Sequence, residues 1–173
     1  MKEYKVIIEN NGTKSYYKPN TNILHNENGP AVENYNGEKS WYINGKRHNE
    51  DGPAIEYANG EKSWWINGEL HNENGPAIEY SNGSKDWYIN GKLHREDGPA
   101  VEYANGEKSW WINGELHNEN GPAIEYSNGD KEWYLNGKEI TESEFNNRNK
   151  VELTLEEIAE KFNINVNQLK IKK

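Results

Sequence analysis

Hydrophobic residues recur along most of the chain in two short runs, Ala-[Val/Ile]-Glu-Tyr and Trp-[Trp/Tyr]-[Ile/Leu], and an Asn-Gly dipeptide follows each run. Both runs are rich in strand-forming residues, and Asn-Gly between such runs is the strongest short-range indication of a β-hairpin. A Gly-Pro pair precedes the first run, where a strand can begin. Each copy of the pattern therefore predicts a hairpin followed by a short return segment.

The pattern repeats every 23 residues, and each copy contains one histidine and one invariant tryptophan. Five copies run from His25 to Gly137, and the segments Tyr57–Gly83 and Tyr103–Gly129 are identical. A single hairpin is not stable alone, so each copy needs its neighbours. The predicted fold class is mainly β: an elongated meander of stacked β-hairpin repeats with a small C-terminal helical cap.

The motif G-x-x-x-W-[WY]-x-N-G-x-x-H resembles a divergent form of the MORN-type repeat. The strings H-R-E-D-G-P-A-V-E-Y-A-N-G and W-Y-x-N-G-K are also similar to uncharacterised repeat proteins of bacteriophages and giant viruses. The resemblance covers residues 11–137 and implies stacked hairpins. The H-x-E-[ND]-G-P-A segment differs from the usual MORN glycine pattern, and a shared fold does not transfer function.

The repeat pattern divides the chain into three predicted regions. Residues 1–24 contain a strand and a degenerate capping repeat, 25–137 the five repeats, and 138–173 a C-terminal segment without Asn-Gly dipeptides. Capping boxes beginning at Thr141 and Thr154 predict two short helices there. Asn163 is the expected left-handed C-cap of the second helix, and a third short helix is expected over residues 166–170. This segment weakly resembles a LysM module or a helix-turn-helix. It is expected either to cover the end of the sheet or to act as a small docking segment.

Composition limits the classes of function. The chain has 173 residues with no cysteine, so disulfides, thiolate zinc sites and a cysteine nucleophile are excluded. No apolar run approaches the roughly 18 residues of a membrane span, and the N-terminus does not resemble a signal peptide. A cytoplasmic location is expected, in the host cytoplasm if a phage encodes the chain. The net charge of −9 argues against direct binding of nucleic acid.

Negative charge is concentrated in the repeats, which carry −11, whereas the N-terminal 24 residues carry +2 and the C-terminal 36 carry 0. Two interpretations remain: a solvated surface that opposes aggregation, or a face that binds a basic partner. Adjacent aromatic columns should lie on opposite faces. We expect the invariant tryptophans to be core and the mixed Trp/Tyr column to be partly exposed, which makes the mixed column the better candidate for partner contact. The candidate partner-binding residues are Glu50, Asp51, Glu56, Trp65, Glu96, Asp97, Glu102 and Trp111.

A catalytic role is not indicated. Each repeat pairs a histidine with a glutamate two positions later, but five copies of one constellation are unlike a singular active site. Equivalent histidines of successive repeats would lie too far apart to share a zinc ion. Packing or turn formation is the preferred role for these histidines, with a metal site as the minor alternative. No enzyme activity, metal or cofactor is therefore expected.

Two classes of function remain. The first is a non-catalytic protein with an acidic, aromatic repeat surface, most simply a phage-type inhibitor of a host defence protein whose basic, nucleic-acid-binding surface it occupies. The second is a binder or sponge for a nucleotide or glycan that stacks on Trp and Tyr. The salt dependence of binding distinguishes the two classes.

Overall fold

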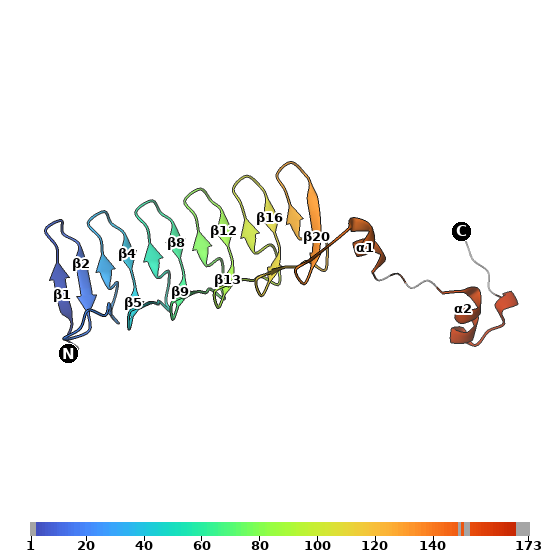
Figure 1. Cartoon of the computed structure of the whole chain (residues 1–173), viewed down its shortest axis with the longest axis horizontal. Helices are drawn as coiled ribbons and strands as arrows, with labels where there is room; N and C mark the ends of the chain where they lie inside the picture. The colour runs from blue at the N-terminus through green and yellow to red at the C-terminus, as the bar shows by residue number, and fades with distance from the viewer. Residues whose placement is uncertain (1–2, 149, 151–152, 169–173) are drawn as a thin grey trace. The chain divides into compact units, whose positions relative to one another are not determined.

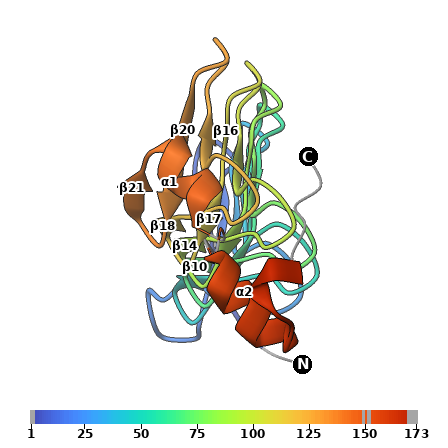
Figure 2. The same ribbon diagram turned by 90° about the vertical axis from the view of Figure 1, so that its right-hand side faces the viewer.

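The computed structural model describes residues 3–148, 150 and 153–168. The chain divides into two compact units, Met1–Ile140 and Thr141–Lys173. In the first unit, hairpins from successive repeats stand side by side, with smaller hairpins below them (Figure 1). In the view along the stack, the hairpins lie one behind another (Figure 2). The predicted fold class is confirmed: the protein is mainly β, a meander of stacked hairpins with short C-terminal helices.

Within the described residues, thirteen strands form one antiparallel sheet, and each strand pairs with its neighbours in the meander. In spatial order these strands are β1 (Lys5–Ile8), β2 (Lys14–Tyr17), β3 (Val32–Glu33), β4 (Lys39–Ser40), β7 (Ile55–Glu56), β8 (Lys62–Ser63), β11 (Ile78–Glu79), β12 (Lys85–Asp86), β15 (Val101–Glu102), β16 (Lys108–Ser109), β19 (Ile124–Glu125), β20 (Lys131–Leu135) and β21 (Lys138–Ile140).

A second, smaller hairpin follows the main hairpin in each of the first four repeats. These hairpins pair β5 (Tyr42–Ile43) with β6 (Lys46–Arg47), β9 (Trp65–Ile66) with β10 (Glu69–Leu70), β13 (Tyr88–Ile89) with β14 (Lys92–Leu93), and β17 (Trp111–Ile112) with β18 (Glu115–Leu116). In the last repeat, β20 runs straight through the equivalent bend and pairs with β21. Residues 138–140, which we assigned to the C-terminal segment, are therefore a strand of the sheet.

The two Asn-Gly dipeptides of each repeat make different turns. In the smaller hairpin of the second repeat, Asn67 and Gly68 both have positive φ, 53° and 90°. Positive φ at both central residues defines the type I′ turn, which matches the twist of the flanking strands. In the main hairpin, only Gly60 has positive φ, and its N–H donates to the carbonyl of Tyr57. Side-chain-free glycine permits both conformations.

Most of the buried residues of the array are small alanines and serines, and Ile55 and Val101 are the larger apolar ones. The alanine that follows Gly-Pro is fully buried in every repeat. In the second repeat, the N–H of Ala54 donates to the carbonyl of Ser63, and its own carbonyl accepts from Trp41. Beside Ala54, Ile55 pairs with the buried serines Ser40 and Ser63. The equivalent fully buried alanines are Ala31, Ala54, Ala77, Ala100 and Ala123.

The C-terminal unit contains α1 (Glu142–Asn147), α2 (Leu155–Phe162) and the 3₁₀ helix η1 (Val166–Gln168). Both predicted capping boxes are present, with Thr141 and Thr154 as the N-caps. The predicted left-handed C-cap is also confirmed, at Asn163. The third predicted helix was to extend to residue 170, and residues 169 and 170 lie outside the described part. The role of this unit as a cap on the sheet stays a prediction.

Deletion of residues 138–173 is expected to destabilise the sheet and promote self-association. It removes β21 and leaves the partner edge of β20 unpaired, which makes a template for strands of other molecules. Deletion of residues 141–173 keeps β21 and is the matched control. We expect a lower melting midpoint and higher oligomers for the longer deletion, measured by thermal unfolding and light scattering. A monomeric product as stable as its control would contradict this role for β21.

Candidate binding surface

A loop with the pattern His-x-Glu-x-Gly-Pro leads into the main hairpin of each repeat, and the residue after the histidine fixes its shape. In the second repeat, Asn49 Nδ2 donates to the carbonyl of Pro53 at 2.8 Å. Asn49 Oδ1 accepts from the N–H of Asp51 at 3.2 Å. An asparagine side chain that bonds its own backbone in this way holds a turn closed. The acidic side chains of the loop are thereby left to project outward.

The histidine of each loop fastens that loop to the smaller hairpin of the same repeat. His48 Nδ1 accepts from the N–H of Asn67, the left-handed turn residue of the following smaller hairpin, at 3.1 Å. Because Nδ1 is an acceptor, a neutral ring carries its proton on Nε2. His48 Nε2 lies 3.5 Å from Glu50 Oε1. The same histidine–turn contact recurs at His25, His48, His71, His94 and His117.

Grooves lie between consecutive loops, with an invariant tryptophan in each. The groove at Trp64 encloses about 380 Å³ between the loops that carry Glu50 and Glu73. Its counterparts at Trp87 and Trp110 enclose about 500 and 180 Å³. Each groove thus combines an aromatic surface with glutamates from both of its loops.

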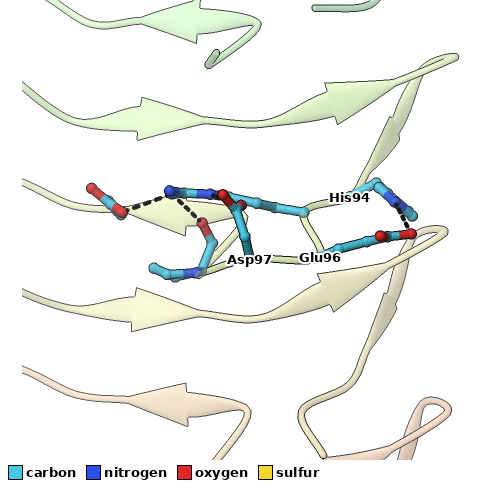
Figure 3. A network of polar contacts seen from close by, with 6 residues as sticks. His94, Glu96 and Asp97 are labelled. Carbon is cyan, nitrogen blue, oxygen red and sulfur yellow. Dashed lines mark hydrogen bonds and ion pairs between the residues drawn. The ribbon is translucent and has the colours of Figure 1, made fainter. Parts of the chain in front are cut away.

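Arg95 makes the groove at Trp87 different from its neighbours. It occupies the loop position held by Asn49 in the second repeat, and its Nη1 donates to the carbonyl of Pro99 at 3.2 Å. Its guanidinium carbon lies 4.1 Å from the centre of the Trp87 ring. It also forms ion pairs with Asp97 and Glu102, each at 3.0 Å (Figure 3). Arg95 lowers the pKa of Asp97 through a hydrogen bond and its positive charge.

The predicted acidic residues separate into two sets. Glu50, Asp51, Glu96 and Asp97 lie on the loops, where the side chains of Glu50 and Glu96 are 78% and 86% exposed. Figure 3 shows Glu96 directed toward His94, with Asp97 beside it on the same loop. These four residues form two acidic pairs, one on each of two loops that are two repeats apart. We call them the loop acids.

Glu56 and Glu102 lie instead on strands of the main sheet, where lysines flank them. Glu56 is paired with Lys39 on one neighbouring strand and Lys62 on the other. Glu102 has the equivalent position between Lys85 and Lys108. Cross-strand pairs of opposite charge stabilise a sheet, so this face is a ladder of alternating charge and not an acidic stripe. Their role in partner binding stays a prediction.

The expectation that the invariant tryptophans are core is wrong, because they are only half-buried, whereas the mixed column is partly exposed as expected. The chain bends at Trp64, between strands of two different sheets, so the alternation of a single continuous strand does not apply. Trp65, from the mixed column, donates its indole N–H to the buried Ser63 at 2.8 Å. Trp111 makes the same contact with Ser109. These two predicted site residues therefore pack back toward the core.

The sequence did not predict that Trp64, Trp87 and Trp110 line the grooves. It also did not predict the role of Arg95 in the groove at Trp87. Arg95 had a visible indication: it is the arginine at a loop position where the other four repeats have asparagine. The grooves had none, because they depend on the spacing of consecutive loops.

Among the described residues, no group of three or more His, Asp or Glu side chains is arranged to hold a metal ion. No helix in this part of the chain is long and apolar enough to cross a membrane.

A search with models of known protein families finds no match to the chain, and no curated protein matches it. The resemblances to MORN-type repeats, to viral repeat proteins and to LysM or helix-turn-helix modules therefore stay predictions. Function has to be inferred from the site itself.

One buried acid lies outside the loops. Asp86 replaces the buried serine of other repeats and accepts a hydrogen bond from the hydroxyl of Tyr80 at 2.9 Å. Burial raises the pKa of Asp86, although the hydrogen bond from Tyr80 opposes this shift. Burial and the charge of Asp86 also raise the pKa values of Tyr80 and Tyr88. The ionised form of Asp86 is thus costly in the folded state.

The Asp86→Asn variant is expected to gain stability relative to the wild type as pH rises. The pKa of Asp86 in the folded state lies above its ordinary value of 3.8. At pH values between the two, the folded state therefore binds more protons than the unfolded state. The free energy of unfolding therefore falls as pH rises through this range. Asparagine does not titrate, so it removes this loss, and its side-chain oxygen can still accept the hydrogen bond from Tyr80. Urea unfolding at pH 3 and pH 7 measures the difference. If the two proteins differ in free energy of unfolding by the same amount at pH 3 and pH 7, the raised pKa of Asp86 is contradicted.

Proposed function

We propose that the chain is a non-catalytic binding protein whose loop face docks a protein partner with a basic surface. The observation that carries the proposal is the placement of the loop acids. They are exposed, they recur on parallel loops, and they border grooves that contain tryptophan. Complementary charge of this kind speeds association and selects partners.

The kind of partner follows from the charge. A surface of regularly spaced carboxylates competes with nucleic acid for the same basic cleft. The resemblance to phage repeat proteins extends the proposal to one class of target, a host defence protein in the cytoplasm whose nucleic-acid-binding cleft is blocked. Inhibition would then result from occupation of the cleft, without chemistry.

Charge reversal of the loop acids tests the proposal. In one variant, Glu50, Asp51, Glu96 and Asp97 are all changed to lysine. The control variant has the same net charge and carries four reversals at exposed positions away from the loops: Glu69, Glu115, Asp130 and Glu139. Both are mixed with a panel of basic nucleic-acid-binding proteins, and binding is followed by displacement of a fluorescent oligonucleotide at increasing salt.

The wild type and the control are expected to displace the oligonucleotide, with an affinity that falls steeply as salt rises. The loop variant is expected to lose displacement while keeping the wild-type circular dichroism spectrum. Unchanged affinity and salt slope in the loop variant would show that the loop acids do not form the docking face.

A second candidate function is binding of a nucleotide or glycan, and the tryptophan in each groove favours it. Aromatic faces stack on bases and sugars. The glutamates that border the groove at Trp64 disfavour anionic nucleotides, so a neutral glycan is the better fit. Quenching of tryptophan fluorescence by oligosaccharides, independent of salt and absent in Trp64→Phe plus Trp110→Phe, would support this candidate over the first.

A further inference from the structure

Arg95 shows what kind of group a groove holds. Its guanidinium lies over the face of Trp87 and contacts two carboxylates and one backbone carbonyl, and its side chain is only 23% exposed. An aromatic face together with carboxylates is the usual environment of a bound guanidinium or ammonium group. In this groove, the chain supplies its own cation.

The grooves on either side have asparagine where Arg95 stands. Asn72 and Asn118 are short, and each donates to the carbonyl of the proline in its own loop. Within the described residues, no cation of the chain lies over Trp64 or Trp110. Both grooves keep glutamates at their borders. Arg95 also lines the groove at Trp110, but its guanidinium lies over Trp87, so the faces of Trp64 and Trp110 have no cation of the described residues above them.

We infer that the grooves at Trp64 and Trp110 are subsites for the arginine or lysine side chains of one extended basic segment of the partner, and that Arg95 blocks the subsite between them. This inference rests on the proposed function and specifies the chemistry that the loop face recognises.

The spacing of the grooves defines the segment. Strands β8 and β16, which precede Trp64 and Trp110, are four strand spacings apart, about 19 Å at roughly 4.8 Å each. A polyproline II segment rises about 3.1 Å per residue and directs every third side chain to the same side. Cations six positions apart therefore reach the two subsites, and the residue midway between them faces Arg95. Such a segment is also ordered before binding, which reduces the entropic cost.

Loop swaps within the chain test the inference without a change in net charge. Asn118→Arg with Asn120→Asp gives the fifth loop the sequence H-R-E-D-G-P-A of residues 94–100, which should block the groove at Trp110. Arg95→Asn with Asp97→Asn gives the fourth loop the sequence H-N-E-N-G-P-A of residues 71–77, which should open the groove at Trp87. Both new loop sequences already occur in the folded chain.

Two fluorescent proline-rich peptides are the probes. The first has arginines six positions apart and serine midway, and the second has arginine at that middle position as well. Versions with citrulline in place of arginine keep the shape without the charge. Binding to the full chain and to both swaps is measured by fluorescence anisotropy.

The wild type is expected to bind the first peptide and not its citrulline version. The swap that blocks Trp110 should weaken this binding at least tenfold. The swap that opens Trp87 should improve binding of the second peptide at least tenfold.

Equal binding of the first peptide by the wild type and the blocked swap would overturn the subsites, as would equal binding of arginine and citrulline peptides. The proposed function fails separately, when reversal of the loop acids leaves binding to basic proteins unchanged. If reversal abolishes protein binding but the swaps have no effect, the face recognises charge only and the inference is wrong.

Discussion

Replacement of Ala54 by aspartate should lower the free energy of unfolding by about 3–5 kcal/mol, because it places an unpaired carboxylate at a site that is fully buried. The backbone N–H and carbonyl of Ala54 are already bonded to Ser63 and Trp41, so they offer the new carboxylate no donor. Urea unfolding followed by circular dichroism measures the change. Since repeats contact only their neighbours, a broadened transition would accompany the lower midpoint.

Ala58→Asp is the matched control for this substitution. Ala58 lies in the turn of the same hairpin and is exposed, so the same chemical change should alter the free energy of unfolding by less than about 0.5 kcal/mol. If aspartate lowers the free energy of unfolding by similar amounts at the two positions, the buried alanines are not the core of the array.

Local features of the fold were predictable from the sequence. The period of 23 residues, the Asn-Gly turns and the two threonine capping boxes each depend on residues that are close together in the chain. Asn67 and Gly68 make a tight turn in any hairpin, and Thr154 caps a helix through Glu157, three residues later. Such interactions need no knowledge of the rest of the molecule.

Features that depend on the bend between the two hairpins of a repeat were not predictable. Trp64 links strands of different sheets, so the directions of Trp64 and Trp65 could not be taken from strand alternation. The pairing of Glu56 with Lys39 and Lys62 depends on register across three strands. Composition indicated an acidic array, but register determines which acids remain free of lysine neighbours.

The candidate site was therefore predicted in part. The loop acids are exposed, as expected of Glu-Asp-Gly-Pro sequences that form surface turns, and their role in partner binding stays a prediction. The grooves were missed because they arise only between loops of consecutive repeats. The link from His48 to Asn67 fastens a loop to the smaller hairpin of its own repeat, and it joins residues 19 positions apart.

Both Trp87→Ala and Tyr88→Ala should lower the free energy of unfolding by about 2–4 kcal/mol, below the upper end of the range for fully buried aromatics. Each side chain is half-buried, so neither is a surface residue. The loss of Trp87 also removes the ring beneath the guanidinium of Arg95. Burial and the charge of the nearby Asp86 raise the pKa of Tyr88.

Tyr35→Ala is the control for the two aromatic variants, because Tyr35 is 71% exposed. We expect it to change the free energy of unfolding by less than about 0.5 kcal/mol. If the Trp87 variant loses several times more free energy of unfolding than the Tyr88 variant, the invariant tryptophans form a core column and the mixed column lies on the surface. Comparable costs would show that both columns pack. The invariant tryptophans would then serve two purposes, since a ring that stabilises the bend also presents one face to the groove.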